Sequence, residues 1–249
     1  MDMSNKNAIM NINESRLSDE QVTQILETVA PYTMVHSTGI EFMARETVRL
    51  ICAQIPGHLV ECGTWKGGSS LAMLLAQRAA FGQVVRPVWM LDSFAGLPEV
   101  TERDGPLAKN WQAGGQPDKF LDNCRAAENE LRDTLAEMGF TPQEGRVIPG
   151  WFSQTLPNVA SAVVNEGIAL LRLDGDWYAS TIECLDSLEP LVSDEGILVV
   201  DDYYAWDGCA RAVHDYLAKN DLPYRIKSLF GNYAMYMVKR AHRKSFEEF

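Results

Sequence analysis

Two pairs of carboxylates follow two short, mostly apolar segments of this chain. Asp174 and Asp176 come after the segment 168–173, and Asp201 and Asp202 come after a second such segment. Apolar runs that end in polar residues are typical of buried parallel strands, whose carboxyl ends meet at one edge of the sheet and hold ligands there. Because carboxylate oxygens are the ligands that Mg²⁺ prefers, the spacing predicts an oxygen-rich cation site.

The four acids are predicted to have two different roles. Asp174, Asp201 and Asp202 are the candidate ligands of a divalent metal, whereas Asp176 can lie beside the metal and accept a proton. The alternative is that Asp201 or Asp202 caps a turn and that Asp176 is solvated. Four clustered negative charges repel one another unless a cation is present, which favours the metal site.

A second pattern predicts a nucleoside site. In the glycine-rich segment 59–69, Glu61 and Gly63 end an expected strand, and Asp92 ends the next one. Asp92 can accept hydrogen bonds from both ribose hydroxyls, and the segment is neither a dinucleotide-binding GxGxxG turn nor a phosphate-binding loop. An acid before the glycine suits an amine-bearing ligand, so the pattern suggests S-adenosylmethionine. The alternatives are a merely tight turn at Gly63 and a capping role for Asp92.

Alternating strands and helices predict an α/β fold with a doubly wound, mostly parallel sheet. We expect residues 1–57 to form an N-terminal helical cap, 58–240 the core with a C-terminal antiparallel hairpin, and 241–249 a charged tail. The expected strands are 58–62, 88–91, 146–148, 168–173 and 197–200, with hairpin strands 224–229 and 233–238; the expected helices are 19–29, 40–54, one starting near residue 67, 118–138 and 207–218.

The segment 93–117 is expected to be a long functional loop, because it has four Gly, three Pro and little periodicity. Trp111 stands in a part of this segment, 99–117, that we predict to be a mobile lid over the site.

Composition excludes several classes of protein. The 249 residues are 46% hydrophobic and carry a net charge of −12, which argues against a nucleic-acid or anionic-membrane surface. No apolar run is long enough to span a membrane, and the start of the chain does not have the order of a signal peptide. The five cysteines are widely spaced without a CxxC, so we expect reduced thiols and a cytoplasmic location. The four histidines form no zinc-binding pattern, and the GxSxG of serine hydrolases is absent.

Taken together, these motifs resemble the macrocin O-methyltransferase family of the TylF and MycF type. The matching pieces are segments 33–36, 61–68, 92–98, 149–157, 172–178, 200–203 and 212–216. The resemblance implies a Rossmann-like class I methyltransferase fold and Mg²⁺-dependent methyl transfer from S-adenosylmethionine to a hydroxyl of a small molecule, often a sugar of a natural product. We also expect a homo-oligomer, with no nucleic-acid or membrane partner. The N-terminal cap and the segment 99–117 depart from the family pattern.

The resemblance also assigns roles to individual residues. It implies a metal bound by Asp174, Asp201 and Asp202 and a general base at Asp176. The cofactor contacts that it implies are Met34, Glu61, Gly63, Asp92, Ser93, Gly150, Trp151 and Phe152. The rival hypothesis is a non-catalytic protein that binds a nucleoside or a metal on the same fold, and an NAD-dependent oxidoreductase is disfavoured by the missing GxGxxG.

Overall fold

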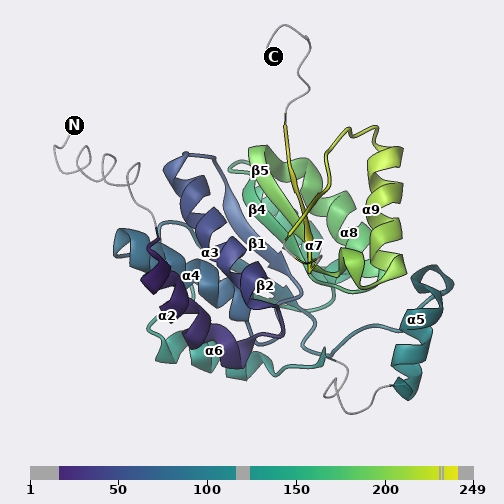
Figure 1. Ribbon diagram of the computed structural model, residues 1–249, viewed down its shortest axis with the longest axis horizontal. Coiled ribbons are helices and arrows are strands. Elements are labelled where there is room, and N and C mark those ends of the chain that lie inside the picture. Colours follow the sequence, from purple (N-terminus) through teal and green to yellow (C-terminus); the bar gives the residue numbers. More distant parts are fainter. Residues whose placement is uncertain (1–16, 116–123, 230, 232, 241–249) are drawn as a thin grey trace, which may run out of the picture.

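The computed structural model describes residues 17–115, 124–229, 231 and 233–240 (Figure 1). These residues form one seven-stranded sheet with the strand order β3-β2-β1-β4-β5-β7-β6. The strands are β1 His58–Cys62, β2 Val88–Asp92, β3 Gly145–Pro149, β4 Ile168–Leu173, β5 Val192–Val200, β6 Lys227–Ser228 and β7 Met235–Val238. The first five are parallel to one another, whereas β7 pairs antiparallel with both β5 and β6.

Helices cover both faces of the sheet (Figure 1). On one face lie α2 Asp19–Val29, α3 Ser37–Cys52, α4 Gly68–Phe81 and α6 Glu128–Glu137; on the other lie α7 Phe152–Val163, α8 Tyr178–Leu188 and α9 Asp207–Lys219. Each layer has its own apolar cluster, because side chains alternate between the two faces along each strand. Leu59 of β1 belongs to the same buried cluster as residues of α4, whereas its neighbour Val60 belongs to the cluster that includes residues of α7 and α8.

The order in which strands are added to the sheet reverses at β1. β2 and β3 lie on one side of β1, and β4 and β5 lie on its other side. This reversal is the topological switch point at which open α/β sheets hold ligands beyond the carboxyl ends of their strands. The fold class expected from the sequence is therefore confirmed, including the antiparallel C-terminal strands.

Several elements differ from the sequence expectation. The helix expected over 118–138 is described only as α6 Glu128–Glu137, and its residues 118–123 lie outside the described residues. The segment 93–117 was expected to be irregular, yet it contains the short helices η2 Glu102–Asp104, α5 Gly105–Asn110 and η3 Trp111–Gly115. Helices α7 and α8 were not expected, and β5 begins five residues earlier than predicted, at Val192.

The N-terminal helices α2 and α3 bury their apolar faces against α4. Val22 and Ile25 of α2 and Ile40 and Met43 of α3 belong to the same buried cluster as Leu71 of α4. Within the described residues, no helix has the length and apolar character that a membrane span requires.

The turn after β1 brings two backbones into contact. Gly63 has φ +91°, and a Cβ added there would lie 1.7 Å from the carbonyl oxygen of Asp174. Glycine is therefore required at this position both for its backbone conformation and for the close approach of the β1 and β4 ends.

We expect Gly63→Ala to lower the free energy of unfolding by at least about 3 kcal/mol, because the left-handed conformation and the steric overlap both add to the cost. The matched control is Gly82→Ala, since Gly82 also has a positive φ of +74° but nothing within 4 Å of an added Cβ. That variant should lose only about 1 kcal/mol. Urea unfolding followed by tryptophan fluorescence measures both, and equal losses would contradict the role assigned to the close approach.

Candidate active site

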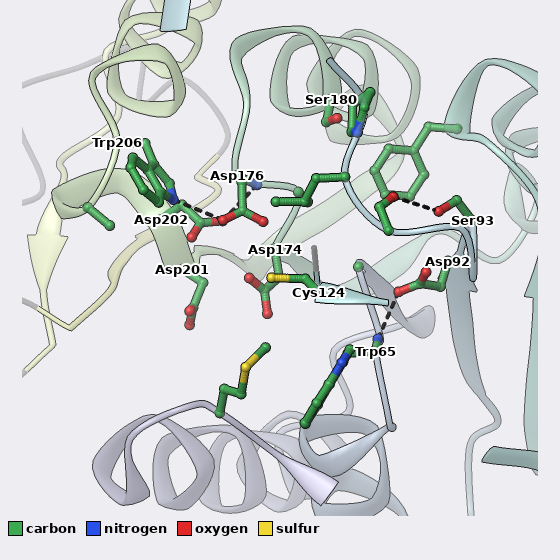
Figure 2. A pocket seen from close by; sticks show the side chains of 18 of the residues that line it. Trp65, Asp92, Ser93, Cys124, Asp174, Asp176, Ser180, Asp201, Asp202 and Trp206 are labelled. Atoms are coloured by element: carbon green, nitrogen blue, oxygen red, sulfur yellow. Dashed lines mark hydrogen bonds between the residues drawn. The ribbon is translucent and has the colours of Figure 1, made fainter. Parts of the chain in front are cut away.

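A cavity of about 260 Å³ opens at the switch point, beyond the carboxyl ends of β1, β2, β4 and β5 (Figure 2). Ten of the residues that line it are site residues predicted from the sequence. The lining comprises Met34, Val35, Gly63, Trp65, Asp92, Ser93, Gly96, Leu97, Pro98, Cys124, Trp151, Phe152, Asp174, Gly175, Asp176, Ser180, Asp201, Asp202, Ala205 and Trp206. Among the described residues, this lining includes five aspartates and no Lys or Arg.

A buried arginine lies beneath the cavity. Arg172 is 1% exposed, and its Nη1 lies 2.8 Å from Oε1 of Glu61 and 2.7 Å from Oδ2 of Asp174. Its Nη2 contacts Oδ1 of Asp201 at 2.7 Å as an ion pair rather than as a directed hydrogen bond. The sheet register explains the contacts, because Glu61 of β1 and Arg172 of β4 are direct partners on adjacent strands.

Burial and the neighbouring opposite charges shift the pKa values of the groups in this cluster in opposite directions. Burial alone would lower the pKa of Arg172, but the surrounding carboxylates raise it well above its usual value. Burial raises the pKa of Glu61 to about 7 and that of Asp201 to about 6, while Arg172 opposes both changes. Arg172 is therefore a permanent positive charge that holds carboxylates from three strands in fixed positions.

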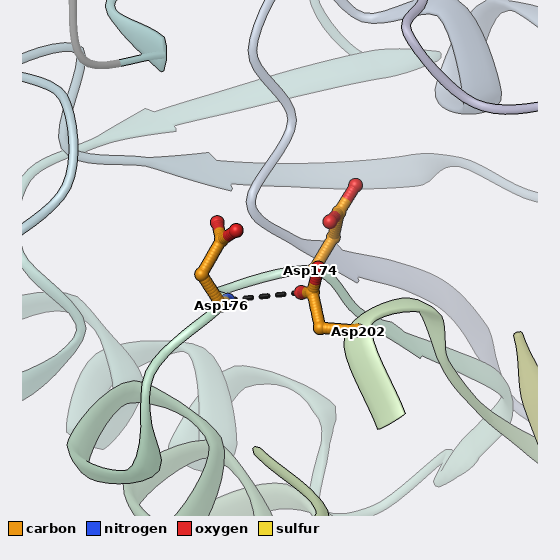
Figure 3. A group of neighbouring side chains, drawn as sticks. All are labelled: Asp174, Asp176 and Asp202. Atoms are coloured by element: carbon orange, nitrogen blue, oxygen red, sulfur yellow. Dashed lines mark hydrogen bonds between the residues drawn. The ribbon is translucent and has the colours of Figure 1, made fainter. Parts of the chain in front are cut away.

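Three aspartates of the described residues lie close enough together to hold a metal ion (Figure 3). One oxygen each from Asp174, Asp176 and Asp202 lies within 4.8 Å of the other two. Burial, followed by the negative charge of Asp174, raises the pKa of Asp176 to about 7, and burial and the neighbouring acids also raise that of Asp202. Three hard oxygen donors at this spacing fit a divalent cation such as Mg²⁺, which would relieve their mutual repulsion.

The backbone at Asp176 is unusual. Asp176 has φ +56°, a left-handed conformation that a non-glycine residue adopts at a cost, and its N–H donates to Oδ2 of Asp202 at 2.9 Å. The end of β4 is thereby tied to η6 Asp201–Tyr204, which follows β5.

The structure places Asp201 differently from the other acids. The sequence predicts Asp201 as a ligand together with Asp174 and Asp202, whereas in the structure its Oδ1 lies against Arg172. Asp176, predicted as a base, completes the close group in its place. Sequence spacing could not distinguish these arrangements, because they depend on the rotamer of each carboxylate.

Asp92 organises the turn after β1. Its Oδ2 accepts hydrogen bonds from the backbone N–H groups of Thr64 and Trp65, at 2.9 and 2.8 Å, and its Oδ1 accepts one from Phe94 at 2.7 Å. Burial raises the pKa of Asp92, and these backbone donors oppose the rise. Asp92 therefore fixes the cavity wall, in addition to lining the cavity.

Two predicted cofactor contacts lie outside the cavity lining. Glu61 is 1% exposed, and its carboxylate accepts a hydrogen bond from Ser70 and pairs with Arg172 beneath the cavity. Gly150 donates its N–H to the carbonyl oxygen of Asp92 and positions the turn that carries Trp151. Met34 and Trp151 lie at the rim, where they are 55% and 39% exposed.

The sequence interpretation missed Trp65, Cys124 and Trp206 as lining residues. Trp206 donates a hydrogen bond from Nε1 to Oδ1 of Asp176 at 2.9 Å (Figure 2). Its position shortly after the second acid pair is a signal that could have pointed to it, as is the position of Trp177 after the first.

The described part of the predicted lid is attached to the core. Asp104 is 1% exposed, accepts hydrogen bonds from Thr101, and accepts another from the backbone N–H of Tyr178 at the start of α8. Nε1 of Trp177 donates to the carbonyl oxygen of Pro98 at 3.0 Å. Residues 116–123 of the predicted lid and its surroundings lie outside the described residues, and lid movement stays a prediction.

Comparisons of the sequence with known proteins agree on one kind of enzyme. The family model described as macrocin O-methyltransferase (TylF) matches residues 2–237. The chain is 31% identical over 216 residues to the 8-demethyl-8-(2,3-dimethoxy-α-L-rhamnosyl)-tetracenomycin-C 4′-O-methyltransferase of Streptomyces olivaceus, a match that covers 87% of this chain and 79% of that protein. It is 35% identical over 191 residues to the demethyldecarbamoylnovobiocin O-methyltransferase of Streptomyces niveus, with 77% and 70% covered.

A solved structure is similar over nearly the same span. The O-methyltransferase NovP superposes with a TM-score of 0.72 at 32% identity, and the match covers 84% of this chain and 83% of that one.

We expect Arg172→Met to lower the free energy of unfolding by about 3–5 kcal/mol, because it leaves buried carboxylates without their positive partner. The control is Arg45→Met, since Arg45 pairs with Asp19 and Glu41 on the surface of α3, where an ion pair contributes at most about 1 kcal/mol. Denaturant unfolding in metal-free buffer measures both variants. A loss of about 1 kcal/mol or less for Arg172→Met would show that Arg172 does not stabilise the carboxylate cluster.

Proposed function

The chain belongs to the macrocin O-methyltransferase (TylF) family, and within that family we propose that it methylates a hydroxyl of a natural-product sugar or a related moiety with the help of Mg²⁺. It is an S-adenosylmethionine-dependent O-methyltransferase. The observation that supports the metal is the close group of Asp174, Asp176 and Asp202 at the floor of the cavity.

We place the cofactor against the part of the cavity that the β1 and β2 ends build. Gly63 allows close backbone approach, and Asp92 and Ser93 follow β2 at the position suited to ribose hydroxyls. Met34, Trp151 and Phe152 provide apolar and aromatic surface at the same cavity. Glu61 and Gly150 then contribute to cofactor binding indirectly. Glu61 acts through Arg172, and Gly150 acts through the turn before Trp151.

We assign the metal to the ends of β4 and β5. Asp174 and Asp202 would hold it together with a third carboxylate. For this third ligand we propose Asp201, which pairs with Arg172 in the structure, so that Asp176 remains the base. A bound Mg²⁺ would lower the pKa of an acceptor hydroxyl and orient its oxygen.

Asp176 is the proposed general base because it lines the cavity and lies beside the proposed ligands. As the acceptor oxygen forms its bond to the methyl carbon, the carbon–sulfur bond breaks and its electron pair goes to sulfur. The hydroxyl proton passes to the Asp176 carboxylate, so the products are the methyl ether and S-adenosylhomocysteine. In-line positioning by the cavity walls contributes further to the rate.

The named relatives support the acceptor class. One is named for a rhamnosyl tetracenomycin and another for demethyldecarbamoylnovobiocin, and both come from Streptomyces species. The acid-rich lining of this cavity, without Lys or Arg among the described residues, suits a neutral polyhydroxylated acceptor.

We expect chelation of the metal to affect methyl transfer but not cofactor binding. EDTA should abolish methyl transfer and leave the affinity for S-adenosylhomocysteine nearly unchanged, because none of the proposed cofactor contacts belongs to the acid group. Isothermal titration measures the affinity for S-adenosylhomocysteine, and a mass-spectrometric assay on a panel of glycosylated acceptors measures methyl transfer. Added Mg²⁺ should restore methyl transfer. Full turnover by exhaustively chelated enzyme would falsify the metal role.

We expect Asp176→Asn and Asp201→Asn to change different kinetic quantities. Asp176→Asn should lower kcat by about a hundredfold or more, the usual cost of losing a general base, with the Mg²⁺ concentration for half-maximal activity unchanged. Asp201→Asn should mainly raise that concentration. The exposed α8 residue Asp186, which pairs with Lys219, provides the charge-matched control Asp186→Asn.

A higher Mg²⁺ requirement in Asp176→Asn together with a loss of kcat in Asp201→Asn would assign the third metal ligand to Asp176 instead of Asp201. Wild-type kcat in Asp176→Asn would remove Asp176 from the mechanism.

A further inference from the structure

One hydrogen bond reaches Asp176 from outside the group of acids. Nε1 of Trp206 donates to Oδ1 of Asp176 at 2.9 Å, and the other carboxylate oxygen points away from the indole (Figure 2). Asp176 follows β4 and Trp206 follows η6, so this bond joins side chains from two different strand ends. The mechanism described above does not use Trp206.

Trp206 is itself held from several sides. Its backbone N–H donates to the carbonyl oxygen of Asp202 at 3.0 Å. Its ring lies edge-on to Trp177 at 5.0 Å and to Trp111 at 6.0 Å between ring centroids, with interplanar angles of 68° in both pairs. Aromatic pairs of this geometry attract one another beyond the area that they bury. The indole is therefore a rigid donor whose direction is set by packing.

The remaining freedom of Asp176 lies in its side chain. Its backbone is fixed by the left-handed φ of +56° and by the N–H bond to Asp202. The carboxylate can still rotate, and an indole N–H, which can only donate, selects one orientation by occupying Oδ1. The second oxygen is then left free of the indole, on a residue that lines the cavity in which the acceptor hydroxyl must lie.

We propose that Trp206 is the positioning residue of the general base: its indole N–H orients the Asp176 carboxylate so that Oδ2 accepts the proton of the acceptor hydroxyl. This inference rests on the proposed role of Asp176. It assigns a function in the reaction to a residue that otherwise forms only part of the cavity wall.

Two substitutions separate the hydrogen bond from the packing of the ring. Trp206→Phe keeps an aromatic ring but has no N–H, whereas Trp206→His keeps a ring nitrogen at the position of the indole Nε1 and loses the larger ring. We expect Trp206→Phe to lower kcat by about ten- to a hundredfold, the effect of losing a hydrogen bond to a charged group, with little change in the affinity for S-adenosylhomocysteine. Trp206→His should retain the greater part of kcat.

The matched control is Trp89→Phe. Trp89 lies in β2, and its indole nitrogen has no hydrogen-bond partner among the described residues, so this substitution should leave kcat unchanged. Thermal melting of each variant shows whether it is folded at the assay temperature. If one Trp206 variant does not fold, the other variant still tests the proposal. A hundredfold loss of kcat in Trp206→His would overturn the proposal, as would wild-type kcat in Trp206→Phe.

A double-mutant cycle tests whether Trp206 acts through Asp176. In the Asp176→Asn background, Trp206→Phe should lower kcat by no more than about twofold, because the group that it positions is no longer a base. If the two losses multiply, Trp206 acts elsewhere, for example on the acceptor, and the proposal is wrong. If Asp176→Asn itself keeps wild-type kcat, the general base of the proposed function fails instead, so the two failures are distinguishable.

Discussion

The pairing of buried Arg172 with acids from three strands is the constraint on which the arrangement of the cavity depends. Glu61, Asp174 and Asp201 come from the ends of β1, β4 and β5, and the guanidinium contacts all three. Removing ionised groups from water is costly, and the cost is offset only when opposite charges meet in good geometry. The permanent charge of Arg172 therefore allows carboxylates to gather at the edge of the sheet.

Backbone strain accompanies this concentration of charge. Trp65, Phe94 and Asp176 all have positive φ values, and each lies in the turn that follows a strand at the cavity. Asp92 stabilises the first two turns by accepting their backbone N–H groups, and Asp202 stabilises the third in the same way. Strained turns are expected where a ligand site must hold side chains in directions that regular structure does not provide.

Aromatic packing connects the site to its surroundings. Trp177 and Trp206 contact each other, and Trp111 of η3 contacts both, so the segment that follows α5 lies against the tryptophan that donates to the proposed base. Pro98 and Asp104, which precede α5, attach the chain to the start of α8. The acid group, the strained turns and the tryptophans therefore form one connected structure.

The sequence by itself determined the parallel sheet, the acids at the ends of β4 and β5 and the family, because strand periodicity and the motif spacing are local properties of the chain. It did not determine that Glu61 turns to Arg172 beneath the cavity, that Asp201 lies against the same guanidinium, or that Trp206 reaches Asp176. It also missed α7 and α8. These contacts join residues that are 29 to 111 positions apart or depend on side-chain rotamers. Only the register of β1 on β4 and the packing of the strand ends could decide them, because burial and charge pairing act between elements rather than within them.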